Sequence, residues 1–247
     1  GELLNEWGTF GASEVGEASP GTFNEPWSVA VAPDGSVYVA DTWNHRIQVF
    51  TPAGEYLTGW GYFGTAEAPD AFWGPRDVLV DNQGRVFVTD TGNKRVVIFD
   101  SGGNYLAQIY SQFNEPVGLA LAPDGTLFVA DTWNRRIVSF RETQSGDFEF
   151  TAEWKVDAWF GESLDNKPYL AVSASGSLLV SEPEGFRVLE FSPQGEFIRT
   201  WGEFGNDSGS FTLLNGLAAD QENGVWVVDS GNDRLLYFNL TNLNGQE

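Results

Sequence analysis

The chain has 247 residues, of which 41% are hydrophobic and 15% aromatic, enough apolar material for one large all-β domain or two small domains. Lys and Arg number 13 against 35 Asp and Glu, so the formal net charge is −22. Such a charge repels nucleic-acid phosphates and anionic lipid head groups. No apolar run is long enough to span a bilayer. We therefore expect no nucleic-acid partner and no direct membrane insertion.

The acidity has two interpretations, solubility or the attraction of cations and basic partners. The absence of cysteine excludes disulfides, thiolate catalysis and zinc held by cysteine. No basic region followed by an apolar stretch opens the chain, so no signal peptide is recognised. Because the chain starts at Gly1 without methionine, we expect a mature or excised piece, fused to another domain in the full-length protein.

A repeated pattern runs along the chain. Its first copy reads Pro-Trp-Ser-Val-Ala-Val from Pro26, then Pro-Asp-Gly, then Asp-Thr-Trp-Asn-His-Arg-Ile from Asp41. The arginine of this last element recurs at about 40 to 50 residues, a period typical of propeller blades. The recurring arginines are Arg46, Arg95, Arg136, Arg187 and Arg234. In the fourth copy, Glu182 replaces the aspartate and Gly185 the asparagine.

Each copy predicts four short strands. In the first copy, β-branched and aromatic runs end at the turn elements Pro-Asp-Gly, Asp-Thr-Trp-Asn and Thr-Pro-Ala-Gly. Four antiparallel strands, repeated radially, form a propeller blade. We therefore predict an all-β, five-bladed β-propeller in a single domain over residues 1–247. The blades are expected at about residues 26–60, 75–109, 116–155, 168–201 and 215–238, the last with residues 1–7.

The two ends of the chain predict how the propeller closes. Residues 1–11 match residues 54–64 and 195–205, which contain a fourth strand and a Trp-Gly-x-Phe-Gly element. The chain thus begins with a fourth strand and ends after a third strand near Phe238. We expect the N-terminal strand to complete the last blade, because pairing removes an exposed strand edge.

Together, the Pro-x-x-Val-Ala-Val, Pro-Asp-Gly, Val-Ala-Asp-Thr-x-Asn-x-Arg-Ile and Trp-Gly-x-Phe-Gly elements resemble the NHL repeat over nearly the whole chain. The resemblance implies a propeller, usually of six blades. Such propellers occur in RNA-binding tripartite-motif proteins, bacterial receptor-kinase sensor domains, peptide-amidating lyases and bacterial membrane or secreted proteins. This chain departs in showing five repeats, and a sixth blade lost from it is left open. By this analogy we expect an extracytoplasmic or secreted setting of a bacterial protein, with a cytoplasmic one left open.

The repeated polar residues are interpreted as scaffolding. An Asp–Arg pair in almost every copy suits a joint between strands or blades that every blade needs. The residues concerned are Asp41, Arg46, Asp90, Arg95, Asp131, Arg136, Arg187, Asp229 and Arg234. The tryptophans of the Trp-Gly-x-Phe-Gly elements, Trp7, Trp60 and Trp201, are expected to pack between blades.

Residues that do not repeat are the better candidates for binding. The second-to-third-strand turns carry Trp43 and Trp133 where other copies have glycine or glutamate, and exposed aromatic residues suit a sugar or protein ligand. The links between blades, on the same face, add further aromatic residues: Trp27, Phe72, Trp73, Trp159 and Phe160. At the mouth of the central channel we expect Ser28, Asp77, Gly118, Tyr169 and Gly216. The predicted ligand contacts are Trp27, Trp43, Trp73, Asp77, Trp133 and Tyr169.

Catalysis is less well supported by these residues. The only histidine, His45, cannot form a three-histidine zinc site, and one carboxylate among the channel residues is a poor calcium cage. The sequence favours a non-catalytic module that binds a protein or a carbohydrate on its loop-rich face. The alternative is a hydrolase or lactonase-type propeller with a metal at the central channel. We expect no cofactor and leave a bound calcium or other cation open.

Overall fold

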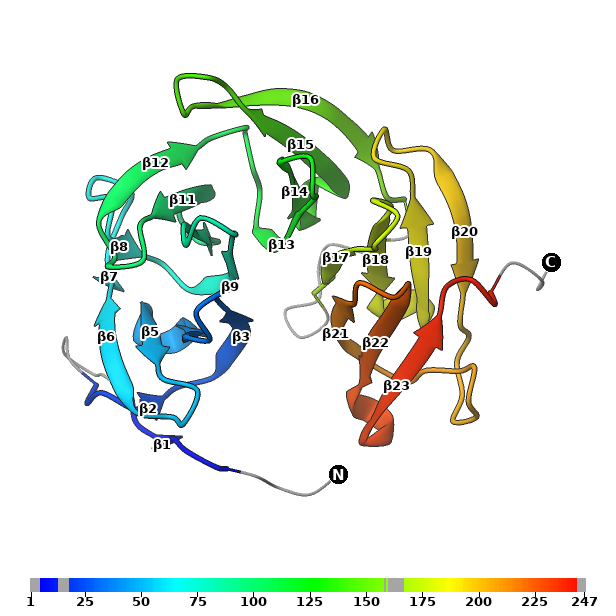
Figure 1. Ribbon diagram of the computed structural model, residues 1–247, viewed down its shortest axis with the longest axis horizontal. Coiled ribbons are helices and arrows are strands. Elements are labelled where there is room, and N and C mark those ends of the chain that lie inside the picture. The colour runs from blue at the N-terminus through cyan, green and yellow to red at the C-terminus, as the bar shows by residue number, and fades with distance from the viewer. Residues whose placement is uncertain (1–4, 13–17, 158, 160–166, 244–247) are drawn as a thin grey trace. The chain divides into compact units, whose positions relative to one another are not determined.

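A computed structural model of the chain describes residues 5–12, 18–157, 159 and 167–243. These residues form β-strands, turns and short 3-10 helices, and no α-helix occurs among them. The fold is a five-bladed β-propeller, which confirms the predicted all-β class (Figure 1). None of the 3-10 helices in the described ranges is long and apolar enough to cross a membrane.

The chain divides into two compact units, residues 1–116 and 117–247. The first unit contains blades 1 and 2. Blade 1 comprises β3 (Pro26–Val31), β4 (Val37–Asp41), β5 (Arg46–Phe50) and β6 (Tyr56–Trp60). Blade 2 comprises β9 (Pro75–Val80), β10 (Val86–Asp90), β11 (Arg95–Phe99) and β12 (Tyr105–Ile109). The single domain expected over residues 1–247 stays a prediction.

The second unit contains blades 3 to 5, although Pro116, the first residue of β13, ends the first unit. Blade 3 comprises β13 (Pro116–Leu121), β14 (Thr126–Asp131), β15 (Arg136–Glu142) and β16 (Phe148–Lys155). Blade 4 comprises β17 (Leu170–Val172), β18 (Leu178–Glu182), β19 (Arg187–Phe191) and β20 (Phe197–Trp201). Blade 5 comprises β21 (Leu214–Ala219), β22 (Gly224–Asp229) and β23 (Arg234–Asn239).

Within each blade the strands lie in chain order and pair antiparallel. A 3-10 turn joins the second and third strands in four blades, and the strands meet there in register, as in the Asp41–Arg46 pair of blade 1. These turns are η1 (Thr42–Asn44), η2 (Thr132–Asn134), η3 (Pro183–Gly185) and η4 (Ser230–Asn232). The repeat therefore places each buried aspartate directly opposite an arginine.

The hydrophobic core lies between neighbouring blades. In the first unit, β3 packs against β9, and Val49, Phe72, Val78 and Phe99 belong to one buried cluster from both blades. Phe72 and Phe99 are fully buried, and each such side chain contributes about 1.5–3 kcal/mol through removal of apolar surface from water. In the second unit, one cluster joins blades 3 and 4 and another joins blades 4 and 5.

Tryptophans at the ends of outer strands pack against the following blade. The ring of Trp60 lies 5.5 Å from that of Phe99 and covers Gly103, in the third-to-fourth-strand turn of blade 2. Trp201 belongs to the core between blades 4 and 5, so the predicted packing of both tryptophans is confirmed. Trp154, which the sequence pattern did not single out, covers Gly195 of blade 4 in the same way.

The predicted closure falls partly outside the described residues. Blade 5 has three strands among them, residues 1–4 of the expected fourth strand lie outside the description, and residues 5–7 are not assigned to a strand. Trp7 covers Gly54 of blade 1 as Trp60 covers Gly103 of blade 2, although 39% of Trp7 stays exposed. Trp7 thus occupies the place of an outer-strand residue of a preceding blade. Completion of the last blade by residues 1–7 stays a prediction.

The Trp-Gly-x-Phe-Gly elements start the loops that enter the next blade. In the first unit, β1 (Thr9–Phe10) pairs parallel with β2 (Thr22–Phe23), and β7 (Tyr62–Phe63) with β8 (Ala71–Phe72). A bridge between Phe204 and Phe211 repeats the arrangement in the second unit. The first glycine of the element is required because Gly61 has a φ of +108° and a Cβ there would lie 2.5 Å from the Phe72 ring.

This geometry predicts a difference between two Gly→Ala variants. Gly61→Ala combines left-handed backbone strain with a clash against Phe72. Gly125 also has a positive φ of +85°, but a Cβ added there would meet no atom within 4 Å. We expect Gly61→Ala to lose roughly 1–3 kcal/mol more free energy of unfolding than Gly125→Ala, the usual cost of overpacking. Urea denaturation of both variants measures this, and equal losses would contradict the packing assigned to Phe72.

Candidate functional site

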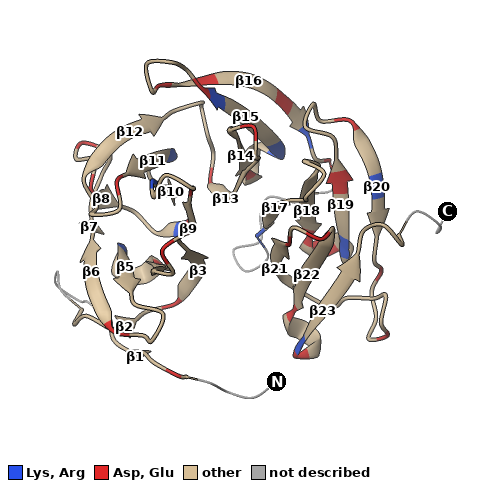
Figure 2. Cartoon of the chain, in the orientation of Figure 1, with Lys and Arg blue, Asp and Glu red and all other residues tan. Residues whose placement is uncertain are grey.

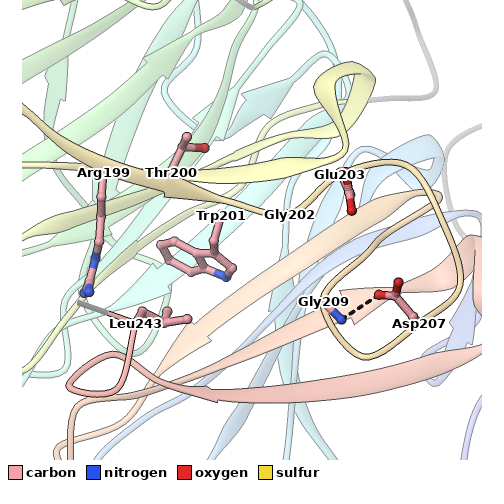
Figure 3. A pocket seen from close by; sticks show the side chains of 8 residues that line it. All are labelled: Arg199, Thr200, Trp201, Gly202, Glu203, Asp207, Gly209 and Leu243. Atoms are coloured by element: carbon pink, nitrogen blue, oxygen red, sulfur yellow. Dashed lines mark hydrogen bonds between the residues drawn. The ribbon is translucent and has the colours of Figure 1, made fainter. Parts of the chain in front are cut away.

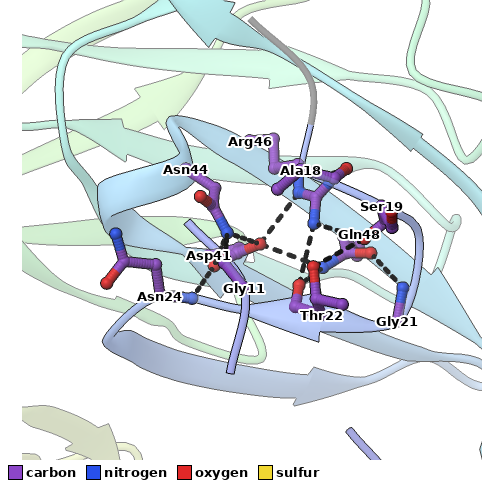
Figure 4. Close-up of polar contacts among 10 residues, drawn as sticks. All are labelled: Gly11, Ala18, Ser19, Gly21, Thr22, Asn24, Asp41, Asn44, Arg46 and Gln48. Atoms are coloured by element: carbon purple, nitrogen blue, oxygen red, sulfur yellow. Dashed lines mark hydrogen bonds and ion pairs between the residues drawn. The ribbon is translucent and has the colours of Figure 1, made fainter. Parts of the chain in front are cut away.

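The second-to-third-strand turn of blade 1 is built around a buried carboxylate (Figure 4). Asp41, at the end of β4, has no exposed surface. Its Oδ2 accepts a hydrogen bond from Nε of Arg46 at 2.8 Å, and its Oδ1 accepts one from the backbone N–H of Asn24 at 2.8 Å. Asn44 donates to both oxygens. The carboxylate therefore joins the turn to the chain entering the blade.

The remaining donors of Arg46 and Asn44 bind the loop that precedes the blade. The guanidinium of Arg46 donates to the carbonyls of Ala18 and Ser19 and, at 2.8 Å, to that of Thr22. Asn44 donates to the carbonyl of Gly11. These bonds hold the incoming loop against the turn through backbone carbonyls of the loop, and no side chain of the loop takes part in them.

The same arrangement recurs in blades 2 and 5. Arg95 donates through Nε to Asp90 at 2.8 Å and through its terminal nitrogens to the carbonyls of Ala68 and Ala71, and its side chain is completely buried. In blade 5, Arg234 contacts Asp229 at 2.9 Å and the carbonyls of Asn206, Asp207 and Ser210.

The pair is more exposed in blade 4. Arg136 of blade 3 contacts Asp131 at 2.7 Å and also Glu153. Arg187 of blade 4 contacts Glu182, but 40% of its side chain is exposed. All five pairs join neighbouring strands of one blade, and in blades 1, 2 and 5 they also anchor the loop before it. This geometry supports the scaffolding role predicted for these residues.

The carboxylates respond differently to burial. Burial raises the pKa of Asp90, although hydrogen bonds from the Trp73 N–H, Asn93 and Arg95 act in the opposite direction. At Asp229, burial also opposes ionisation, but hydrogen bonds from the Thr212 N–H, Asn232 and Arg234 outweigh it and hold the pKa of that carboxyl below its ordinary value.

The burial of these pairs predicts a graded loss of stability. Arg95→Ala leaves Asp90 buried without its cationic partner, which costs about 3–5 kcal/mol. Arg187→Ala also leaves a buried carboxylate, Glu182, but 40% of the Arg187 side chain is exposed in the parent chain, so we expect a smaller loss than for Arg95→Ala. Thermal unfolding of the two variants measures the difference. If Arg95→Ala melts like the parent, the scaffolding role is wrong.

Blades 1 and 2 each have an indole where the second-to-third-strand turn meets the link that enters the blade. In blade 1 the indole belongs to the turn, and in blade 2 it belongs to the link. In blade 1 the turn carries Trp43, and the link carries Asn24, whose carbonyl accepts the backbone N–H of Trp43. In blade 2 the link carries Trp73 and the turn carries Gly92, whose N–H binds the Trp73 carbonyl. A Cβ at Gly92 would lie 2.5 Å from the Trp73 ring. Glycine is therefore required at position 92, because the Trp73 ring packs directly against its Cα.

Four ring side chains of the first unit form a continuous surface, which we call the aromatic row: Trp43, His45, Phe63 and Trp73. Successive ring centroids are 6.2, 4.9 and 6.1 Å apart. Trp43, Phe63 and Trp73 are 40%, 63% and 48% exposed. The structure thus brings together two of the predicted binding residues, Trp43 and Trp73, and adds His45 and Phe63.

Sequence reasoning missed the two central members of the row. Phe63 belongs to a Trp-Gly-x-Phe-Gly element that was assigned a structural role, yet the phenylalanines of all three such elements, Phe10, Phe63 and Phe204, are at least 63% exposed. His45 was considered only as a zinc ligand. The repeat contained a signal, because blade 4 has an aromatic residue, Phe186, at the position of His45. The Phe186 ring meets that of Phe204 edge to face, with centroids 4.9 Å apart.

His45 is held in one neutral form. It adopts a left-handed conformation after η1, and its Nδ1 accepts the Gly74 N–H at 3.1 Å, so the ring proton lies on Nε2. Burial lowers the pKa of His45, while the charge of Asp41 acts in the opposite direction. The imidazole is therefore mainly neutral at pH 7, and its ring contacts those of both Trp43 and Phe63.

The lowered pKa predicts how stability depends on pH. Unfolded His45 binds a proton below about pH 6.5, whereas the folded ring resists it. Its contribution to stability is therefore full above that pH and is lost as the pH falls toward the folded pKa. Because His45 is the only histidine, NMR titration of one imidazole gives the folded pKa directly, and a midpoint at or above about 6.5 would contradict the burial effect. His45→Phe, which introduces the residue found at this position in blade 4, should remove this component of acid destabilisation.

The other predicted site residues are engaged by the protein's own side chains. The guanidinium carbon of Arg76 lies 3.8 Å from the ring centroid of Trp27, and Asp77 accepts the hydroxyl of Ser28 at 2.5 Å. In the second unit, the Lys167 ammonium lies 5.9 Å from the Trp133 ring centroid, and the N–H of Tyr169 donates to Ser181.

Two aromatic link residues serve packing. Trp159 is 3% exposed and donates to the carbonyl of Ser181, and Phe72 is fully buried. The hypothesis that links display aromatic side chains on the surface is therefore wrong for these two. Phe160 lies outside the described residues.

A hollow of about 590 Å³ lies in the second unit (Figure 3). It is lined by Arg199, Thr200, Trp201, Gly202, Glu203, Asp207, Gly209 and Leu243. Arg199 already contacts Glu190 and the carbonyl of Leu240, and Asp207 accepts the N–H of Gly209 and the hydroxyl of Ser210. Within the described part of the chain, no group of three or more His, Cys, Asp or Glu side chains could hold a metal ion. The aromatic row is therefore the stronger candidate site.

Comparison with known proteins identifies the repeats. The NHL repeat matches residues 23–50, 72–99 and 113–140, which correspond to the first three blades. These three segments of the chain thus match the NHL repeat, as the sequence elements predicted. No curated protein sequence matches it significantly.

Solved structures share the fold at low identity. A streptogramin B lyase is 14% identical with a TM-score of 0.64, and the match covers 87% of this chain and 66% of the lyase. A gluconolactonase from Xanthomonas campestris is 17% identical (TM-score 0.60; 81% and 68% covered). A chain of a nidogen–laminin complex is 15% identical (TM-score 0.66; 91% and 80% covered). The chain spans just under two thirds of the lyase, and these likenesses show the fold alone.

Proposed function

We propose that this NHL-repeat propeller is a non-catalytic binding module that holds its partner on the aromatic row of blades 1 and 2. The observation that carries the proposal is the row itself, in which three large aromatic side chains stay exposed in one chain of ring contacts. Aromatic residues are enriched in the centres of protein interfaces, and contiguous exposed apolar surface marks interaction sites.

The rigidity of the surrounding chain supports this assignment. Asp90 accepts the backbone N–H of Trp73 at 2.8 Å. The backbone N–H of Trp43 donates to the carbonyl of Asn24, whose own N–H donates to Asp41. A binding residue on such a support loses little conformational freedom when a partner is bound. Loops positioned by a rigid scaffold are the usual place for recognition.

The side-chain chemistry supports binding over catalysis. The one histidine uses Nδ1 to accept a backbone N–H, and the buried carboxylates of the turns are each neutralised by an arginine. These buried, arginine-paired carboxylates are not placed to exchange a proton with a ligand on the row. The nidogen–laminin likeness fits a propeller that takes part in protein assembly. The extracytoplasmic setting and the fusion to a further domain belong to the same proposal.

Truncation of the exposed indoles tests the binding role. The double variant Trp43→Ala/Trp73→Ala is expected to fold, since exposed substitutions usually change stability by about 0.5 kcal/mol each. Loss of two interface anchors should cost about 2 kcal/mol or more of binding free energy. Selection of ligands from a displayed peptide library and a glycan array against the parent chain, followed by titration of both proteins, measures the effect.

A matched control is available on blade 5. Trp226 is 47% exposed and its ring lies 4.9 Å from that of Tyr237, so Trp226→Ala removes a comparable exposed indole that is not part of the row. It should leave the affinity unchanged. If selected ligands bind the double variant as well as the parent chain, or if the double variant unfolds, the row is not the binding site.

A further inference from the structure

We propose that the aromatic row recognises the arginine or lysine side chains of a basic polypeptide segment. This inference rests on the proposed function and specifies the partner's chemistry. Its first support is the state of the two outer indoles. One face of Trp73 lies on Gly92, where no side chain intervenes, and nearly half of the residue remains exposed. A flat indole supported on one side offers its other face for stacking.

The chain itself shows which chemistry its indoles accept. Arg76 stacks over Trp27 at 3.8 Å, and Lys167 lies over Trp133 at 5.9 Å. Both contacts place a cation on the negative face of the ring, the favourable geometry for a cation–π interaction. Over Trp43 and Trp73, in contrast, no cation from the described residues is found. Among the turn and link indoles named here, these two leave a ring face for a cation from outside the chain.

A carboxylate adjoins one end of the row. Glu25 is exposed, and its Oε2 accepts the indole N–H of Trp43 at 3.0 Å. A cation resting on the Trp43 ring would therefore lie near a negative charge as well as a ring face. A guanidinium is suited to this combination, because it stacks on aromatic faces and pairs with carboxylates in the same plane.

The charge around the row points the same way. The loop between Phe63 and Trp73 contains exposed Glu67 and Asp70, and Lys94 is the exposed base of the adjoining turn. Acidic residues also outnumber basic ones in the whole chain, 35 to 13. Figure 2 colours the acidic residues red and the basic ones blue. A cationic segment would be attracted to this surface, and an anionic one repelled.

The orientation of the rings argues against a carbohydrate. Trp43 and His45 stand at 88° to each other, and Phe63 and Trp73 at 85°. Consecutive rings therefore do not form one flat platform along which sugar units could stack. Separate, differently tilted ring faces suit side chains that reach the surface one at a time from a peptide.

The experiment uses the full chain and a set of matched peptides. A Gly/Ser peptide carrying spaced arginines is titrated calorimetrically at low and at physiological ionic strength. A second peptide replaces arginine by citrulline, in which a planar, uncharged urea group takes the place of the planar guanidinium. We expect the citrulline peptide to bind at least about tenfold more weakly, because the cation–π contact and the contact with Glu25 both require the charge.

Protein variants locate the binding. Trp73→Ala and Glu25→Gln should each weaken binding of the arginine peptide several-fold. Glu25→Gln keeps an acceptor for the indole N–H of Trp43. Trp226→Ala is the control and should change nothing. Equal binding of the arginine and citrulline peptides would overturn the proposal. So would arginine binding that is unaffected by Trp73→Ala, since this would be general attraction to an acidic protein.

The outcome for other ligands separates this inference from the proposed function. A neutral peptide or an oligosaccharide that binds through Trp43 and Trp73, with no binding of the arginine peptide, overturns cation recognition and leaves the row as a binding site. If no ligand depends on the row, both proposals fail.

Discussion

The buried contact between the turn carboxylate and the repeat arginine is the constraint on which the rest of the structure depends. Asp41 and Asp90 are fully buried, and ionised carboxylates in such places are tolerated only with a cation and several hydrogen-bond donors. The arginine satisfies the carboxylate and then has donors left for the carbonyls of the incoming loop. One interaction therefore fixes the strand pair, the turn and the entry to the blade.

This constraint explains why the residues of the aromatic row lie where they do. Once Asp and Arg hold the turn, its outer position varies between blades, and Trp43, Gly92 and Glu184 occupy equivalent places. Blade 2 obtains its indole from the link instead, by placing Trp73 on Gly92. The aromatic row is thus built from residues of the variable positions, supported by residues of the repeated ones.

The electrostatics of the chain fit the same division. The repeat arginines form ion pairs and hydrogen bonds with carboxylates and carbonyls of the blades, and the remaining charge of the chain is strongly acidic. Two of the cations that lie over indoles, Arg76 and Lys167, are themselves almost completely buried. Uncovered aromatic faces in an acidic surface are consequently left for groups that the protein does not supply itself.

The sequence by itself determined the all-β class, the blades and the Asp–Arg joints, because these follow from a repeated pattern in which each unit contacts only its neighbours. Only the tertiary structure decided which aromatic residues form a surface. Trp159 and Trp43 look alike as link and turn tryptophans, yet one is buried and the other exposed. Phe63 and His45 come together from different segments across 18 residues of chain. Such neighbours depend on how the incoming loop folds back onto the turn, and no local pattern encodes that path.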